Sequence, residues 1–414
     1  MAISRAPERA QPQGAAQTSS ATRTAAVMFA GFCAFVTLYA PQPLLPMLAR
    51  EFRVSAGSVS LVLTASTAAV ALAAPFAGVV ADRLGRKRVI VLSALLLSLP
   101  TAGAAAAGSL AQMLAWRFWQ GVFTPGIFAV TIAYVNDEWE EGVGAAMSSY
   151  VAGTVLGGFC GRMISALVAA HFSWRWSFLA LAALDAVCGG AMWVWLPRDR
   201  HRARTRREAS APRAMLGHLR NPPLAATYAV GFCVLFTLIS TFTYVNFYLA
   251  APPFRLGTTA LGLIFAVYLI GAVVTPVAGR AIDRLGHRFT LVAAFCGGVG
   301  GICLTLAAHL PAVLLGLALT STGVFIAQSA ASSYVGRLAE GARGAAVGLY
   351  VMFYYTGGSF GAALPGGFWN RGGWPATVAL IAAVQGLTIA LCLIFWKPAA
   401  AGEGGEPYAS APIG

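Results

Sequence analysis

Long apolar segments, separated by short polar or charged stretches, follow one another along almost the whole chain. Most have the roughly 20 residues that a helix needs to cross the hydrocarbon of a bilayer. Backbone groups in lipid must be satisfied within their own segment, so the pattern predicts membrane-spanning helices. Twelve spans are expected, at 25–47, 59–81, 89–107, 110–134, 143–169, 174–197, 224–250, 258–281, 289–308, 311–333, 343–366 and 374–396.

A charged string occurs twice: PFAGVVADRLGRK at 75–87 returns as PVAGRAIDRLGHR at 276–288. Each copy lies at the end of one predicted span and just before the next. Such a repeat is typical of two parallel halves that enclose a shared transport pathway. The predicted fold class is therefore an all-α integral membrane protein, with twelve transmembrane helices in two pseudo-symmetric six-helix bundles.

Composition and charge indicate how the chain is oriented in the membrane. With 58% hydrophobic and 10% charged residues, the chain is unlike soluble globular proteins. Its net charge of +14 would suggest a nucleic-acid partner in a soluble protein, but most basic residues collect on one side of the predicted membrane. The opposite side holds Arg50, Arg53, Arg175, Arg255 and Arg371. The positive-inside rule places both termini in the cytoplasm, and the lipid bilayer, not nucleic acid, is the expected partner.

Arginine far outnumbers lysine, as in GC-rich bacterial genomes, so a bacterial inner (plasma) membrane is expected. The expected divisions are a disordered cytoplasmic tail 1–24, an N-terminal bundle 25–197, a basic cytoplasmic linker 198–223, a C-terminal bundle 224–396 and a cytoplasmic tail 397–414.

The first copy of the repeat is expected to form a tight turn at Gly85, where Asp82 orients the basic cluster or caps the next helix. The acidic stretch 136–141 contains no base and would lie on the same membrane face. We expect it to pair with the basic turn only when the cytoplasmic side is closed, as a conformational latch.

The first span ends in the proline-rich string YAPQPLLP at 39–46, which cannot continue a regular helix. Two interpretations remain open. The helix is broken inside the bundle, with freed carbonyls facing a cavity, or it simply ends at the outer surface.

The pattern Gly-x-x-Ala-Asp-Arg-x-Gly-Arg-Lys-x-x-Ile at 78–90 resembles the loop signature of the major facilitator superfamily, and a weaker copy occupies 279–291. The resemblance covers nearly the whole chain and implies that the two loops control conformational change. The residues implicated are Gly78, Asp82, Arg83, Gly85, Arg86 and Lys87 in the first copy, and Gly279, Asp283, Arg284, Gly286 and Arg288 in the second.

Two further motifs are similar to those of the family's twelve-span drug and metabolite:proton antiporters. The fourth span carries RFWQG at 117–121, and the fifth has glycines at four-residue intervals from 153 to 161. Gly158 stands where the antiporter motif has proline, and Arg162 where it has a last glycine. The resemblance implies proton-coupled efflux of small organic compounds by antiport, as in multidrug resistance.

Three ionisable residues fall inside predicted spans: Arg117, Arg162 and Asp185. Charges there are costly and usually mark a pathway or a pair. One hypothesis is that Arg117, helped by Arg162, receives an anionic or strongly polar group of the substrate. The alternative is structural, with Arg117 bonding backbone carbonyls and Arg162 paired with Asp185. Asp185 is also the candidate proton carrier.

By family position and polarity, aromatic, phenol and amide groups are expected to line a central cavity. These candidate substrate contacts are Tyr39, Gln42, Gln120, Tyr244, Asn246, Tyr268, Gln328, Tyr350 and Tyr354. Each taken alone also suits helix packing. A positive site favours neutral polar compounds such as sugars, anionic compounds or amphipathic drugs over lipophilic cations.

Other function classes match less well. The sequence has no HExxH motif, no P-loop and no convincing Ser-His-Asp set, so neither an enzyme nor an ATP-driven pump is expected. The 7 cysteines lack CxxC spacing, and no metal or cofactor is expected. A lipid flippase, a metabolite importer, a transport-dead receptor or a membrane-embedded enzyme stays open as an alternative. We expect a monomeric secondary transporter that moves small molecules and protons by alternating access.

Overall fold

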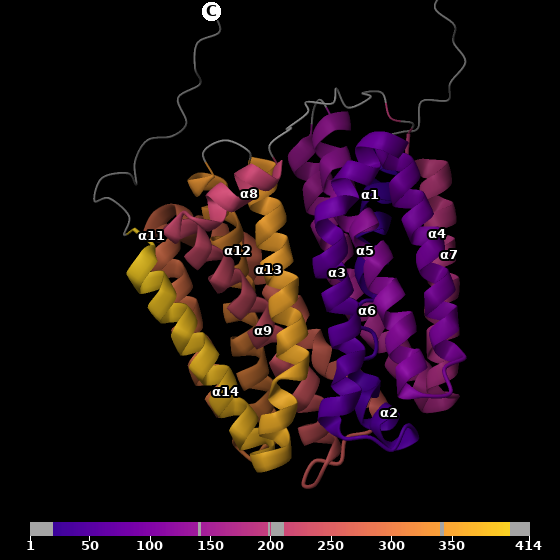
Figure 1. Ribbon diagram of the computed structural model, residues 1–414. Coiled ribbons are helices and arrows are strands. Elements are labelled where there is room, and N and C mark those ends of the chain that lie inside the picture. The colour runs from indigo at the N-terminus through magenta and orange to yellow at the C-terminus, as the bar shows by residue number, and fades with distance from the viewer. Residues whose placement is uncertain (1–19, 140–141, 198, 200–210, 340–342, 398–414) are drawn as a thin grey trace, which may run out of the picture.

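The computed structural model describes residues 20–139, 142–197, 199, 211–339 and 343–397, and every regular element in these ranges is a helix (Figure 1). The longer helices are α1 (Ser20–Val36), α3 (Ala56–Leu84), α4 (Arg86–Ala105), α5 (Leu110–Glu138), α6 (Val143–His171), α7 (Trp174–Trp195), α9 (Pro222–Ala250), α11 (Val267–Leu304), α12 (Leu310–Leu338), α13 (Arg343–Ala363) and α14 (Pro365–Phe395). The shorter ones are α2 (Leu45–Glu51), α8 (Ala211–Leu219), α10 (Thr258–Leu263) and the 3-10 helices η1 (Gln42–Leu44) and η2 (Ile264–Ala266).

Within the described ranges, 9 helices are long and apolar enough to cross a membrane. α11 runs through two predicted spans, because the turn between them is the single residue Gly286, with φ of +78°. α14 contains a similar break at Gly372 and Gly373. The all-α architecture of membrane-length helices agrees with the sequence analysis, while the full count of twelve stays a prediction.

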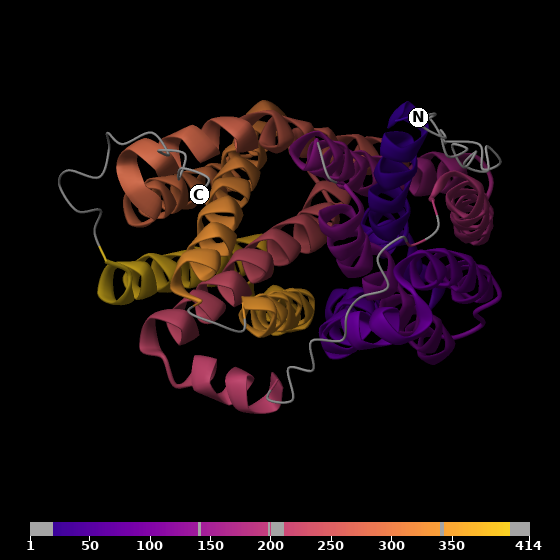
Figure 2. The same ribbon diagram turned by 90° about the horizontal axis from the view of Figure 1, so that it is seen from above.

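The helices form two groups side by side, α1–α7 in one and α9–α14 in the other (Figure 1). The junction of α3 with α4 and the bend within α11 lie at the same end of the molecule as α8, at the top of Figure 1. We call this the hairpin end, and the opposite end, marked by α2, the far end. From above, α8 lies at the outer edge of the second group (Figure 2).

Glycines bring equivalent helices of the two groups into backbone contact. A Cβ built on Gly157 of α6 would lie 2.3 Å from the carbonyl oxygen of Phe32 in α1. In the second group, a Cβ on Gly357 of α13 would lie 2.0 Å from the carbonyl oxygen of Phe232 in α9. No side chain fits at either position. The duplication seen in the sequence is thus matched by the same close approach in both groups.

Gly85 alone joins α3 to α4, with φ of +93°. The start of α4 is capped by Asp199, whose Oδ1 accepts a hydrogen bond of 3.1 Å from the Lys87 backbone N–H. A Cβ on Gly85 would lie 2.7 Å from the other carboxylate oxygen of Asp199. The expected capping by Asp82 is therefore wrong, because Asp82 is exposed and Asp199 occupies that position.

The basic turn does pair with the acidic stretch. Arg86 forms an ion pair with Asp137 and donates a hydrogen bond of 2.7 Å to the Ala133 carbonyl. Glu140 and Glu141 lie outside the described residues. The ion pair is made entirely within the first group. That it forms only when the hairpin side is closed stays a prediction.

The contacts that join the groups are concentrated toward the far end, and the ribbons stand apart at the hairpin end (Figure 1). Hydrogen bonds between the groups, among the described residues, are Gln42–Thr243 at 3.4 Å, Thr64–Ser359 at 3.1 Å and Thr67–Ser359 at 2.9 Å. Gly57 approaches Gly366 so closely that a Cβ on Gly57 would lie 3.1 Å from the Gly366 Cα. The structure is closed at the far end.

The first predicted span is broken inside the protein. α1 stops at Val36, and the chain continues through a turn, η1 and α2. Residues 37–45 are all buried. The structure therefore supports the broken helix and not an end at the outer surface.

We expect Gly157→Ala to lower the Tm of the purified protein, because the added methyl group meets the Phe32 backbone and overpacking costs about 1–3 kcal/mol. Gly190→Ala is the matched control, since a Cβ there has no atom within 4 Å. Thermal unfolding of both variants in the same detergent tests this. Equal Tm values would contradict the tight contact between α1 and α6.

Candidate functional site

Arg117 on α5 is completely buried and uses all five of its N–H donors. Its partners are the Val62 carbonyl at 3.2 Å, the Thr37 carbonyl at 3.1 Å, Gln120 Oε1, the Leu38 carbonyl and Ser66 Oγ at 2.8 Å. Thr37 and Leu38 belong to the break that follows α1. Arg117 therefore ties the broken end of the first helix to α3, as the structural alternative anticipated.

Arg162 on α6 is 2% exposed and has different surroundings. Its Nε donates to Gln42 Oε1 at 2.7 Å, and Nη1 donates to the Gly158 carbonyl at 2.6 Å. Three aromatic rings surround the guanidinium, with centroids 5.1 Å (Tyr39), 4.6 Å (Phe265) and 5.0 Å (Tyr268) from its carbon. Tyr39 comes from the first group, and the other two rings come from the second. The guanidinium thus lies at the interface between the groups.

No carboxylate among the described residues lies within 4.0 Å of Arg162. The expected pairing of Arg162 with Asp185 is wrong, because each has other partners. Two of the five N–H groups of Arg162 form hydrogen bonds, whereas Arg117 uses all five. The hydroxyl of Tyr268 is also buried without a hydrogen-bond partner. Spare donors in a buried, positively charged place are suited to an acceptor-rich ligand.

Gln42 connects this arginine to the second group. Its Oε1 accepts from Arg162, while its Nε2 donates to the Thr243 hydroxyl at 3.4 Å. The side chains of Gln42 and Thr243 are fully buried. Arg162, Gln42 and Thr243 therefore form a hydrogen-bonded chain across the closed far-end interface.

Asp185 on α7 is fully buried among hydroxyl and thiol groups. The Thr37 hydroxyl lies 3.0 and 2.9 Å from its two oxygens, the Thr101 hydroxyl 3.1 Å from Oδ2, and Cys33 Sγ 3.8 Å from Oδ1. It forms no ion pair within the described ranges. Thr37 links Arg117 to Asp185, because its carbonyl accepts a hydrogen bond from Arg117 and its hydroxyl donates one to Asp185.

The expected cavity lining separates into clusters. Tyr39, Gln42 and Tyr268 contact Arg162, as described above. Gln120 gives its oxygen to Arg117, and its Nε2 is buried without a partner. This amide nitrogen is a second spare donor near the break.

The other five predicted lining residues lie elsewhere in the second group. Tyr244 donates to the Ala362 carbonyl at 2.9 Å, and Asn246 donates to the carbonyl of Phe242 in its own helix at 2.5 Å. A separate cluster contains the Tyr350–Gln328 hydrogen bond of 3.0 Å and the stacked rings of Tyr350 and Tyr354, with centroids 6.0 Å apart. Apart from the Asn246 bond within α9, these contacts hold helices together, and none of them reaches Arg162.

Sequence reasoning missed Thr37, Thr101, Phe265 and Thr243. Threonine and phenylalanine are ordinary residues of apolar helices, so the first three carry no local signal. Thr243 had one: it is separated from Gln42 by 201 positions, the spacing at which the charged string repeats. The two residues in contact are equivalent positions of the two halves.

At the second turn, His287 lies with its ring centroid 5.4 Å from that of Tyr334. Burial and the positive charge of Arg337 lower the pKa of His287, against a smaller opposing effect of Asp283. The charged groups that act on His287 are therefore Arg337 and Asp283, not Arg162 or Asp185.

Comparisons with known proteins agree with this architecture. The family model described as Major Facilitator Superfamily matches residues 27–267 and 246–412. The chain is 32% identical over 375 residues to the inner membrane transport protein YnfM of Escherichia coli (strain K12), covering 89% of this chain and 88% of that protein. It is 31% identical over 360 residues to the uncharacterized MFS-type transporter YybF of Bacillus subtilis (strain 168), covering 86% and 89%.

A crystal structure of a mutant of the nucleoside transporter NupG has the same fold, with a TM-score of 0.77 at 14% identity, covering 90% of this chain and 100% of that one. These proteins are transporters, not enzymes. The duplicated turns, the membrane-length helices and the family match over nearly the whole chain lead to one conclusion: this protein is a multi-pass membrane transporter of the major facilitator superfamily.

Proposed function

We propose that the protein exports small organic anions across the bacterial inner membrane in exchange for protons, as a monomer with both termini in the cytoplasm. The observation that carries the proposal is Arg162, a buried guanidinium at the interface of the two groups. It has spare donors and no carboxylate partner among the residues that the structure describes. The glycine stripe of α6, which resembles the antiporter motif, supports the export direction.

The charge of Arg162 selects the class of substrate. A buried, unpaired charge is costly at membrane depth and is usually kept for a function. Cation–π contacts offset part of this cost, at about 2 kcal/mol when desolvated. A carboxylate or similar group on the substrate would complete the site, because the planar guanidinium matches such groups with paired hydrogen bonds. Neutral sugars would leave the charge uncompensated.

The position of Arg162 also makes its surroundings depend on conformation. Its aromatic neighbours Phe265 and Tyr268 belong to the second group. Separation of the groups at the far end would remove these rings and open the guanidinium to that side. In the orientation expected from the basic residues, the far side is the periplasm, where the exported anion would be released.

Asp185 is the proposed proton carrier, because it is a fully buried carboxyl without an ion-pair partner among the described residues, and a protonated form also fits one of its contacts. The Thr101 hydroxyl has one hydrogen but faces two acceptors, the Leu97 carbonyl at 2.7 Å and Asp185 Oδ2 at 3.1 Å. A protonated Asp185 would donate to Thr101, which would then donate to Leu97, so every group is satisfied. The link through Thr37 connects this proton to the break beside Arg117.

We expect Arg162→Gln to reduce export of an anionic probe, carboxyfluorescein, at least tenfold in everted vesicles. The loss of one charge-assisted interaction, at about 1.5–3 kcal/mol, is sufficient for this factor. Arg162→Lys should retain an intermediate rate. Arg175→Gln is the matched control, because Arg175 pairs with Glu51 at the exposed far end. Wild-type transport by Arg162→Gln, at equal protein levels, would refute the assignment.

We expect Asp185→Asn to remove the dependence of transport on an imposed pH gradient while leaving anion exchange without a gradient intact. Proteoliposomes with and without the gradient separate the two activities. His287→Asn is the control, and its response to the gradient should match the wild type. Gradient-driven transport that persists in Asp185→Asn would exclude this carboxyl as the proton carrier.

A further inference from the structure

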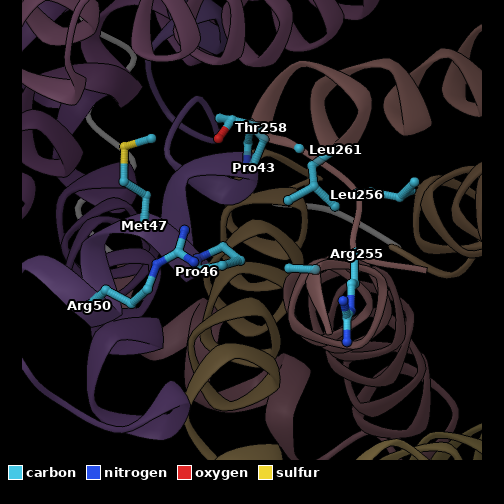
Figure 3. Close-up of a pocket in the computed structure, with 10 residues that line it drawn as sticks. Pro43, Pro46, Met47, Arg50, Arg255, Leu256, Thr258 and Leu261 are labelled. Atoms are coloured by element: carbon cyan, nitrogen blue, oxygen red, sulfur yellow. The ribbon is translucent and has the colours of Figure 1, made fainter. Parts of the chain in front are cut away.

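A second positively charged site lies at the far end, in a pocket of about 250 Å³ between the two groups (Figure 3). One wall comes from η1 and α2, with Pro43, Met47 and Arg50. The other comes from the loop after α9 and from α10, with Arg255, Thr258 and Leu261. The pocket is therefore built by both halves of the transporter.

The charge in this pocket is not balanced by the protein. Arg50 and Arg255 are exposed, and neither has a carboxylate within 4.0 Å in the described part of the chain. The one acidic residue of the far-end loops, Glu51, is paired with Arg175 at 3.1 Å. Five arginines against one acid give this end a positive potential, which draws anions from solution.

The backbone at Arg255 fixes where this side chain begins. Its φ of +50° is a left-handed conformation that residues other than glycine rarely adopt. Arg53, outside the pocket, has the same conformation with φ of +53°, so the conformation positions Arg255 but does not by itself mark a ligand site. Here the conformation places Arg255 at the pocket rim (Figure 3).

The pocket lies just outside the contacts that close the far end. Pro43 follows Gln42, which bonds to Thr243 of the second group. Leu261 precedes Gly262, where a Cβ would lie 2.5 Å from the Ala166 side chain of the first group. Because its walls belong to different groups, the pocket keeps this shape only while the far end is closed.

We propose that this pocket binds a small organic anion from the far side, with carboxylate groups between Arg50 and Arg255, and that the bound anion holds the far end closed. Its volume is below the roughly 300–1,000 Å³ of sites for drug-sized ligands, so the ligand is small. A ligand that binds one conformation shifts the equilibrium toward it. The site acts as an external brake on the transport cycle, and it does not depend on the proposed role of Arg162.

The test uses citrate as the probe and the full chain in nanodiscs of zwitterionic lipid, at constant ionic strength because exposed charges are screened by salt. Citrate is expected to raise the Tm saturably and to slow hydrogen exchange in residues 251–257. Arg50→Gln and Arg255→Gln should each weaken citrate binding at least tenfold. Arg53→Gln and Arg371→Gln, which remove the same charge at the same end outside the pocket, should bind as the wild type does.

Arg162→Gln separates this site from the proposed substrate site, and citrate binding should survive in that variant. Equal losses of citrate affinity in Arg53→Gln and Arg255→Gln would show that citrate responds to the general positive potential of this end. That result would overturn the proposed site. Wild-type binding by Arg50→Gln and Arg255→Gln would overturn it as well. Loss of the citrate effect in nanodiscs that contain anionic phosphatidylglycerol would assign the pocket to a lipid headgroup and also overturn the proposal.

Discussion

A helix that breaks inside a membrane protein leaves carbonyl oxygens that lipid cannot satisfy. Here the break after α1 frees the carbonyls of Thr37 and Leu38, and both accept hydrogen bonds from Arg117. The same arginine reaches α3 through Val62 and Ser66. The turn after α1 places Tyr39 and Gln42 beside Arg162, and Thr37 beside Asp185. Its position depends on the Arg117 guanidinium, whose N–H donors all form hydrogen bonds.

The two buried arginines show how context decides the role of a charged residue. Both lie at membrane depth, and both fall within or beside motifs that resemble those of the family, so the sequence alone does not assign them different roles. Arg117 has a hydrogen-bond acceptor for every donor, so all its hydrogen bonds stabilise the fold and none is left for a ligand. Arg162 is surrounded mainly by ring faces from both groups and keeps donors in reserve. The second arrangement suits a ligand that comes and goes.

Much of the architecture was accessible from the sequence, because hydrophobic length and a repeated motif are local signals. They predicted the membrane-length helices and the paired turns. At the prolines they predicted that the regular helix stops, but they left open whether it breaks inside the bundle or ends at the outer surface. The partners of individual side chains were not accessible, since they depend on how helices distant in sequence pack. Asp185 was expected beside Arg162 but lies among hydroxyls from α4 and the end of α1. Asp199, from the segment after α7, replaced Asp82 as the cap of α4.

The glycine contacts between α1 and α6 limit how the transporter can move. Gly153, Gly157 and Gly161 each face a carbonyl oxygen of α1 at a distance that leaves no room for a methyl group. Axial rotation of α6 would bring larger side chains into that seam, so the two helices must tilt together as one rigid body. Any displacement of Arg162 then pulls on the end of α1, where the Thr37 hydroxyl contacts Asp185, so that the positions of Arg162 and Asp185 become mechanically coupled.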